Sequence, residues 1–266
     1  MFANWEGMAY SPKFKPRALD DLIRLGREND GGYVLPKRVV DASEGLLSFG
    51  VSDDWEFEKA FLRQKRVNLV AFDHTVTGRF WAKWLLGNLV RGTLTLKPEK
   101  LRRCYRLIDY KRFFDGKSRR HVRKAIGYSA SGAIDLSGAL RESRLDEPIF
   151  LKMDIEGWEY RVLDELASRA KRFSGMAIEF HDTDLHRQRI EDFIEAVAAD
   201  QALVHFHPNN FGARDNRGDS IVVEMTFANT SLISQSELRA QPLPIAGLDA
   251  PNNPHSPEGP IEFATL

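Results

Sequence analysis

The chain has 266 residues, of which 42% are hydrophobic, so it can bury a substantial core, and α/β domains of this length commonly form one unit. Lysine and arginine together number 38, as do aspartate and glutamate, which excludes a global charge that steers the protein toward nucleic acid or a membrane surface. The single cysteine excludes an internal disulfide and a cysteine-based zinc cluster, and it fits a reducing compartment.

No targeting or membrane-spanning segment is expected. Residues 1–10 lack a cationic start followed by an apolar run, so they do not resemble a secretory signal. The longest apolar stretch, residues 81–90, is interrupted by Lys83, Gly87 and Asn88 and falls short of the roughly 20 residues that a span requires. We therefore expect a cytoplasmic protein without a membrane span.

The region before the first long strand predicts a chain reversal. Asp30-Gly31-Gly32-Tyr33 is typical of a turn between two short strands, forming either a hairpin that caps the core or a flap beside a cofactor. We expect an N-terminal segment, residues 1–43, that carries this hairpin packed on the core.

From residue 44 to 230, β-branched and aromatic runs alternate with helical patterns, which predicts a doubly wound α/β sheet with crossover helices. Helices are expected after Asp53, which would cap the first of them, around Trp81, after Gly157 and around Phe193. The last two strands are predicted to form a hairpin that closes the sheet. The predicted strands are 45–50, 67–73, 122–128, 148–154, 175–181, 202–207 and 220–227.

Two further regions stand out by composition. Residues 97–124 contain twelve lysines and arginines against three acidic residues, so we expect a basic insertion at about 90–124. It is either a solvated helical surface or a site for an anionic acceptor, such as a phosphorylated or uronic-acid-bearing glycan, and nucleic acid is the less favoured partner. Six of the twelve prolines lie between Pro242 and Pro260, which predicts an extended tail over residues 231–266.

The first two strands end in residues suited to a nucleoside cofactor, because ligands of open α/β sheets bind at the carboxyl ends of the strands. Gly50 permits close approach to the backbone, and N–H groups beside Ser52 and Asp53 can bind a carboxylate such as that of S-adenosylmethionine. The glycine-rich turn that a diphosphate prefers is absent, which counts against NAD. Asp73 ends the second strand, either as a ribose ligand or as a helix cap.

Acidic residues follow the fourth strand. Asp154 and Glu156 flank a tight turn at Gly157, with Lys152 one strand period behind. Repulsion between two carboxylates raises the pKa of one unless a cation is nearby, which suits a general base or a metal site. Further candidates follow the fifth and sixth strands, where a histidine can be either a ligand or a satisfied structural residue: Glu179, His181, Asp182, His205, His207 and Asn209.

Residues 151–159 resemble the K-x-D-x-E-G-x-E signature of FkbM-type methyltransferases. Residues 30–33, 47–58, 71–75, 179–181 and 248–254 also resemble parts of one branch of that family, although its members carry a more glycine-rich turn after the first strand. The resemblance implies a class I methyltransferase sheet of seven strands with the last antiparallel, and methyl transfer from S-adenosylmethionine to a hydroxyl. It assigns the cofactor to Gly50, Ser52, Asp53, Asp73 and Thr75.

A sugar hydroxyl is a poor nucleophile, so the implied reaction requires activation of the acceptor. We expect direct base catalysis, with Asp154, Glu156 and His181 as the catalytic residues. The alternative is a divalent metal held by Asp154, Glu156, His181 and Asp182. The expected acceptor is a carbohydrate or glycosylated small molecule. The other hypotheses are a catalytically silent module that keeps this fold for binding, and a methyltransferase that reaches nucleic acid through the basic insertion.

Overall fold

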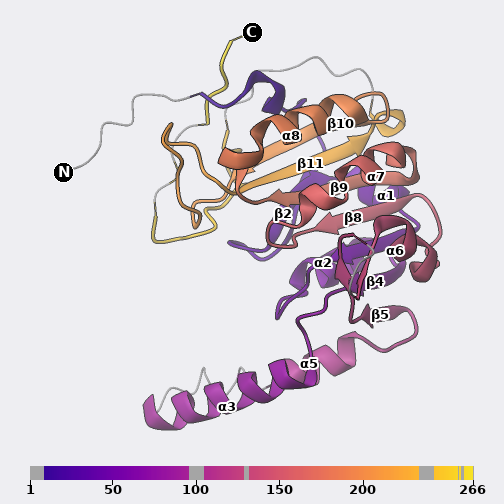
Figure 1. Cartoon of the computed structure of the whole chain (residues 1–266), viewed down its shortest axis with the longest axis vertical. Coiled ribbons are helices and arrows are strands. Elements are labelled where there is room, and N and C mark those ends of the chain that lie inside the picture. The colour runs from indigo at the N-terminus through magenta and orange to yellow at the C-terminus, as the bar shows by residue number, and fades with distance from the viewer. Residues whose placement is uncertain are drawn as a thin grey trace.

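A computed structural model of the chain describes residues 9–95, 105–128, 132–233, 243–256, 258 and 261–265, with side chains given to residue 88 in the first range. Seven strands form one sheet in the order β10-β11-β9-β8-β3-β4-β5 (Figure 1). Their bounds are β3 (Gly45–Phe49), β4 (Asn68–Phe72), β5 (Arg119–Val122), β8 (Ile149–Met153), β9 (Phe173–Phe180), β10 (Gln201–Pro208) and β11 (Val223–Asn229).

The direction of the strands confirms the expected sheet. The five strands from β5 to β9 pair in parallel, whereas β11 is antiparallel to both β9 and β10. Because β11 is the last strand of the sheet in the chain and is inserted between β9 and β10, this is the doubly wound class I methyltransferase order with its last strand antiparallel. The predicted closing hairpin is confirmed as β10 and β11.

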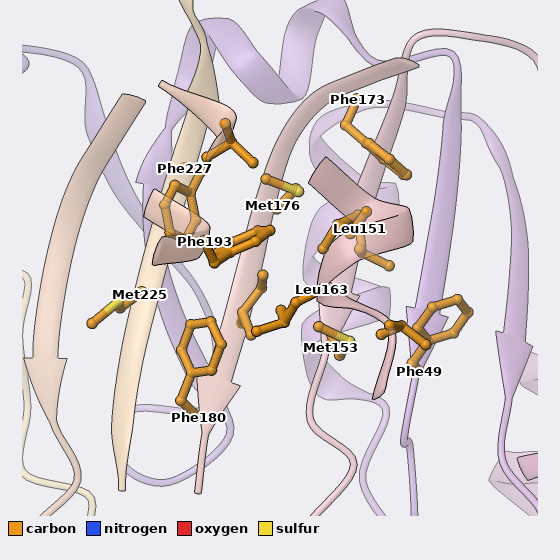
Figure 2. Close-up of a cluster of buried hydrophobic side chains, with 14 of the residues drawn as sticks. Phe49, Leu151, Met153, Leu163, Phe173, Met176, Phe180, Phe193, Met225 and Phe227 are labelled. Carbon is orange, nitrogen blue, oxygen red and sulfur yellow. The ribbon is translucent and has the colours of Figure 1, made fainter. Parts of the chain in front are cut away.

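Both faces of the sheet are covered, because successive strand residues point to opposite sides. Leu47 and Phe49 face α6 (Leu136–Ser143), α7 (Leu163–Ser168) and α8 (Thr183–Val197), forming the core that Figure 2 shows. Leu46 faces the other side, which is covered by α1 (Lys37–Ala42), α2 (Glu56–Gln64) and the antiparallel hairpin of β1 (Leu22–Gly26) and β2 (Gly32–Pro36). The carboxyl edge of the sheet is left for ligands.

The chain between β4 and β5 forms α3 (Gly78–Thr95) and α5 (Arg106–Phe113), and α3 extends beyond the β5 edge of the sheet (Figure 1). Trp81 fixes the base of α3 by packing its ring 5.1 Å from that of Tyr110. The expected basic insertion falls partly on residues 96–104, which lie outside the described residues. Among the helices that the structure describes, none is long and apolar enough to cross a membrane.

The predicted third strand was wrong in position. β5 spans Arg119–Val122, so it shares only Val122 with the predicted range 122–128. The strand lies at the edge of the sheet and its residues are all partly exposed, so it lacks the apolar alternation of a buried strand. The apolar residues after it form β6 (Ala125–Ile126), which pairs with β7 (Ala133–Ile134) in a separate sheet.

Two predicted helix starts also differ. Asp54, not Asp53, holds the start of α2, because its Oδ1 accepts a hydrogen bond of 3.1 Å from the Glu56 amide. After Gly157, the chain first forms a 3₁₀ turn, η2 (Glu159–Arg161), and α7 begins only at Leu163. Trp158 therefore precedes the helix that the sequence assigned it to.

The last described residues pack against the sheet and the hairpin. Asn252 donates a 2.7 Å hydrogen bond to Glu224 of β11. Phe263 forms a parallel bridge with Tyr10, so the segments near the two chain ends lie side by side. Hydrogen bonds of Asn210 with Asn253 and Ser256 place this part of the chain beside the loop that follows β10.

Candidate functional site

A cavity of about 830 Å³ lies at the carboxyl ends of β3, β4, β8 and β9. Hairpin β1–β2 contributes Asp30 and Gly31 to its wall, and the loop after β10 contributes Asn209, Phe211 and Gly212. Of the candidates predicted from the sequence, His181, Asp182, His205 and His207 do not line the cavity. Those that do are Gly50, Ser52, Asp53, Asp73, Thr75, Asp154, Glu156, Glu179 and Asn209.

The lining of this cavity is acidic. Eight aspartates and glutamates face it against three lysines and arginines, although three of the acids, Asp30, Glu58 and Glu179, have pKa values raised by burial. The imbalance favours a ligand with positive charge and disfavours a polyanion inside the cavity. The acids are Asp30, Asp53, Asp54, Glu58, Asp73, Asp154, Glu156 and Glu179, and the cations are Arg27, Lys124 and Lys152.

Gly50 follows β3 in a left-handed conformation, with φ at +78°. A Cβ atom there would lie 1.7 Å from the carbonyl oxygen of Asp154. The glycine is therefore required because the end of β8 approaches the backbone, which differs from the expected reason that a ligand does so. The result is that the turns after β3 and β8 are in direct contact.

Asp73 holds the turn after β3 together. Its Oδ2 accepts hydrogen bonds from the amides of Val51, at 3.0 Å, and Ser52, at 2.7 Å. Its Oδ1 accepts from the amide and the hydroxyl of Thr75, at 2.7 and 2.6 Å. Burial raises the pKa of Asp73, but these four bonds outweigh it and the pKa is lowered.

These bonds change what the cofactor-side residues can do. The amides of Val51 and Ser52 are committed to Asp73 and are not free for a ligand carboxylate. All four acceptor positions of the Asp73 carboxylate are filled, so a ribose hydroxyl would have to displace one of the present donors. Asp73 is thus first a structural acid that shapes the cavity wall.

Lys152 is a buried cation among acids. Its Nζ donates to the carbonyl of Gly50 at 2.7 Å and lies 3.3 Å from Oδ2 of Asp154. Burial lowers the pKa of Lys152, but Asp154, Glu58 and Glu179 outweigh burial and raise it. Lys152 therefore stays charged and holds the Asp154 carboxylate in place.

Glu179 is a candidate residue whose role the sequence does not define. Its side chain is buried at the end of β9, where it accepts hydrogen bonds from the Tyr33 hydroxyl at 3.2 Å and from Asn209 Nδ2 at 2.8 Å. Burial and the charges of Asp154 and Glu224 raise its pKa well above the usual range. The signal was present, since a glutamate in an otherwise apolar buried strand needs specific partners.

The turn after Asp154 depends on Glu159, the last residue of the signature. Glu159 is fully buried, and its Oε1 accepts from the amides of Ile155, at 3.0 Å, and Gly157, at 3.3 Å. Glu156 and Gly157 both have positive φ, at 56° and 90°. Such a conformation is unfavourable for glutamate, so the hydrogen bonds of Glu159 maintain a strained turn.

Glu159 also fixes His181, whose Nδ1 lies 3.2 Å from Oε1 of Glu159 and whose Nε2 lies 3.5 Å from Oε2 of Glu156. Burial lowers the pKa of His181, but the hydrogen bond with Glu159 and the neighbouring acids outweigh it and raise the pKa to about 9. The ring therefore carries a proton on each nitrogen at neutral pH.

Three of the four candidate metal ligands come together. Single ligand atoms of Asp154, Glu156 and His181 all lie within 4.8 Å of one another, whereas Asp182 is not in this group. Asp182 begins α8 with a φ of 50°, which turns the chain beside Gly157.

The two histidines of β10 lie elsewhere. His205 Nε2 is 2.9 Å from Oδ1 of Asp249, and His207 Nε2 is 2.7 Å from Oε1 of Glu258. Both rings are buried against the last part of the chain and neither lines the cavity. They connect residues 249–258 to the sheet.

The described part of the basic stretch is partly neutralised. Arg106 pairs with Asp54 at 3.2 Å, Arg119 with Asp115 at 2.7 Å, and Lys124 with Glu142 at 2.6 Å. These pairs support the interpretation as a solvated surface for the part of the stretch that the structure describes.

Comparison with known proteins adds a family match. Residues 113–214 match the model described as "Methyltransferase FkbM domain". The match confirms the resemblance found in the sequence, and it supports methyltransferase activity that depends on S-adenosylmethionine. No curated protein matches the chain.

Similar solved structures are distant. An rRNA methylase from Streptococcus thermophilus has a TM-score of 0.39 and 9% identity, covering 72% of this chain and 92% of that one. A putative RNA methyltransferase from Pyrococcus horikoshii has a TM-score of 0.37 and 11% identity, and the match covers 73% of this chain and 77% of that one. Precorrin-6y C5,15-methyltransferase from Geobacter metallireducens has a TM-score of 0.36 and 10% identity, and the match covers 71% of this chain and 84% of that one. None of these identifies the acceptor of the present chain.

Proposed function

We propose that the chain is an O-methyltransferase that uses S-adenosylmethionine to methylate a hydroxyl of a carbohydrate or a glycosylated small molecule. The acidic cavity at the carboxyl ends of β3, β4, β8 and β9 is the observation that carries this proposal. Bound S-adenosylmethionine supplies an electrophilic methyl group on a positively charged sulfonium. Carboxylates around the cavity stabilise that charge, and they accept hydrogen bonds from the hydroxyls of a neutral acceptor.

The cofactor side would be formed by the turn that Asp73 holds. With the amides of Val51 and Ser52 committed to Asp73, the groups left to contact the cofactor are the side chains of Ser52, Asp53 and Thr75 and the edge of the Gly50 peptide. Thr75 can turn its hydroxyl from Asp73 to a ribose oxygen, since a hydroxyl both donates and accepts. Asp73 would then act through the turn as well as through any direct contact.

Asp154 is the proposed general base. It lines the cavity, it is partly exposed, and Lys152 lies 3.3 Å away as a fixed counter-charge. In the proposed step the acceptor oxygen forms a bond to the methyl carbon as the bond between that carbon and sulfur breaks. The hydroxyl proton passes to the Asp154 carboxylate, beside which the Lys152 ammonium lies as a fixed counter-charge.

His181 is proposed to position Glu156 rather than to take the proton. A ring that is protonated at neutral pH, with its pKa raised to about 9, has no free lone pair for an incoming proton. It contacts Glu156 and Glu159, and it does not line the cavity. The imidazolium can donate to Glu156 and so fix that carboxylate at the cavity mouth.

Binding and turnover separate this proposal from a silent binding module. We expect the chain to bind S-adenosylmethionine in a calorimetric titration and to label one fraction of cell glycans, lipids or small metabolites from a labelled methyl donor. Asp154→Asn should keep cofactor binding and lose about 10²–10⁴-fold in transfer rate, as for loss of a general base. If no S-adenosylmethionine binds, the enzyme interpretation is removed.

The metal-dependent mechanism is the alternative, supported by the grouping of Asp154, Glu156 and His181. Initial rates measured after chelation and magnesium add-back decide the matter. Activity abolished by the chelator and restored by magnesium would exclude the metal-free mechanism.

A further inference from the structure

Two exposed aromatic side chains lie among the acids of the cavity wall. Trp158 is 38% exposed and follows the Asp154 turn directly, and Phe211 is 60% exposed in the loop after β10. Large apolar side chains are unfavourable in water, and aromatic faces are the surface on which the apolar side of a sugar ring packs. The pair therefore marks where an acceptor ring would lie near Asp154.

The guanidinium of Arg161 stacks on the ring of Trp158. The centre of the Arg161 guanidinium lies 3.4 Å from the centroid of the Trp158 ring and 5.9 Å from that of Tyr128. Trp158 precedes the 3₁₀ turn η2 and Arg161 ends it, and side chains three residues apart eclipse in a 3₁₀ helix. The local backbone therefore places the cation on the indole.

Arg161 has no anionic partner among the residues that the structure describes. Its side chain is exposed, and its contacts there are the two rings. The partly exposed arginine on α8 differs, because Arg189 pairs with Asp164 at 2.6 Å. An arginine with five donors, held flat on a ring and free of a carboxylate, is suited to bind an external anion in bidentate geometry.

The backbone makes room for this arrangement. Gly127 has a φ of +158°, and a Cβ atom there would lie 3.0 Å from Cε3 of Trp158. Gly127 therefore lets the indole lie against the strand β6, with Arg161 stacked on the ring. The position of Trp158 is set by the chain on both sides, as a recognition surface requires.

We infer that Trp158 and Arg161, with Phe211 from the loop after β10 that lines the same cavity, form an acceptor subsite for a sugar that carries a single anionic group. The inference rests on the proposed function, and it names the acceptor class. The sugar ring packs on the aromatic surface, its carboxylate or phosphate pairs with Arg161, and its reacting hydroxyl points to Asp154. The acids inside the cavity require that the anionic group stay outside, beside Arg161.

A polyanion fits this site less well. Aromatic rings and arginine also bind single-stranded nucleic acid, which stacks its bases and needs a positive groove along the backbone. Eight acidic residues line the adjoining cavity, so phosphates on both sides of a target base would be repelled there. Arg161, which has no acidic partner in the described part of the chain, supplies one anion site, and that matches a monosaccharide unit.

Ligand binding to the protein loaded with S-adenosylhomocysteine tests the subsite. The probes are methyl β-glucuronide, glucose 6-phosphate, the neutral methyl β-glucoside and a short single-stranded oligoadenylate, measured by saturation-transfer NMR and calorimetry. We expect at least one anionic sugar to bind about tenfold or more tightly than the glucoside, as for one added charge-assisted hydrogen bond. The tighter of the two identifies carboxylate or phosphate as the anion.

Variants locate the binding. Arg161→Gln should remove the preference for the anionic sugar and leave glucoside binding unchanged, whereas Trp158→Ala should weaken all three sugars. Arg189→Gln, which changes a partly exposed arginine with a carboxylate partner, is the matched control and should change nothing. Equal affinity for charged and neutral sugars, no sugar binding, a preference that survives Arg161→Gln, or tighter binding of the oligoadenylate each overturns the inference.

Failure of the proposed function gives a different result. Binding of S-adenosylmethionine is measured separately on the same proteins, and all three variants are expected to retain it because the ring contacts and ion pair of these side chains are with Tyr128, Asp164 and one another, not with Gly50 or Asp73. A protein that binds the anionic sugar through Arg161 without binding S-adenosylmethionine would refute the proposed enzyme and keep the subsite. A protein that binds S-adenosylmethionine but shows no preference for the anionic sugar would refute the subsite and leave the proposed enzyme standing.

Discussion

The Nζ atom of Lys152 lies 3.3 Å from Oδ2 of Asp154, and the same ammonium donates to the carbonyl of Gly50 at 2.7 Å. One side chain thus connects the ends of β8 and β3. It is also the cation that the buried acids Glu58 and Glu179 share. A buried charge of this kind is costly to remove, because its partners lose their compensation.

Lys152→Met is therefore expected to destabilise the fold as well as to stop methyl transfer. Loss of the cation from a buried acid cluster should lower the free energy of unfolding by about 3–5 kcal/mol, measured by urea denaturation near neutral pH. The matched variant is Lys59→Met, which removes a partly exposed lysine paired with Glu56 and Asp109 and should cost about 1 kcal/mol or less. Equal losses in the two variants would contradict the shared-cation account.

Asp73→Asn tests whether Asp73 acts through the turn. The amide nitrogen would face N–H donors where a carboxylate oxygen now accepts, so at least two hydrogen bonds are lost and the free energy of unfolding should fall by about 1–3 kcal/mol without cofactor. Urea denaturation of the cofactor-free protein measures this change. A role confined to the ribose predicts unchanged stability in that state and weaker S-adenosylmethionine binding alone.

Glu159→Gln should lower the pKa of His181. Replacing the buried carboxylate removes the charged acceptor at Nδ1, so the pKa should fall from about 9 by about 1–3 units, toward the value of an ordinary histidine. NMR titration of the imidazole nitrogens measures it directly. Glu156→Gln is the comparison, since that side chain is 86% exposed at 3.5 Å and should produce a smaller decrease. A larger decrease in the Glu156→Gln variant would show that the exposed Glu156, and not the buried Glu159, sets the pKa of His181.

The contact of His207 with Glu258 and Glu224 makes stability depend on pH. Burial lowers the pKa of His207, but the two carboxylates outweigh it and raise the pKa from 6.5 to about 10. Because the folded state binds this proton more tightly than the unfolded state, the stabilisation is complete below about pH 6.5 and is lost as pH rises through about 10.

We therefore expect the free energy of unfolding to fall between pH 7 and 10, by about 1–3 kcal/mol from this contact, in a series of urea denaturations. Glu258→Gln should flatten that dependence. Glu195→Gln, which changes an exposed acid paired with Lys13, should leave the slope as it is in the unaltered chain. A slope that Glu258→Gln does not change would refute the assignment to His207.

Much of the sheet could be predicted because its strands bury apolar runs on both sides. β3, β4, β8 and β9 carry such runs and were predicted within two residues. β5 could not be, since an edge strand of polar residues is fixed by its hydrogen bonds to β4 and not by burial. The spacing to Glu56 predicted Asp53 as the cap, whereas the path of the turn brings Asp54 to the Glu56 amide instead.

The sequence predicts which acidic residues belong to the site, but it does not predict which side chains they contact. Asp154 and Glu156 follow from the signature, and the cavity does include them. The protonation of His181 depends on Glu159, which is near in sequence to Asp154 but reaches His181 only through the fold. The same applies to Glu179, whose partners Tyr33 and Asn209 come from segments 146 and 30 residues away.

Residues late in the chain complete the wall around Phe211. Asn210 donates to the carbonyls of Asn253, at 3.1 Å, and Ser256, at 3.0 Å, and accepts from the Asn253 amide at 2.6 Å. During synthesis, the turn that Asp73 closes has all its partners once residue 75 has been added, whereas the loop at Asn210 must wait for Ser256. The hydrogen bonds of Asp73 can therefore form early in synthesis, whereas the part of the cavity wall that carries Phe211 gains its supporting contacts only after Ser256 has been added.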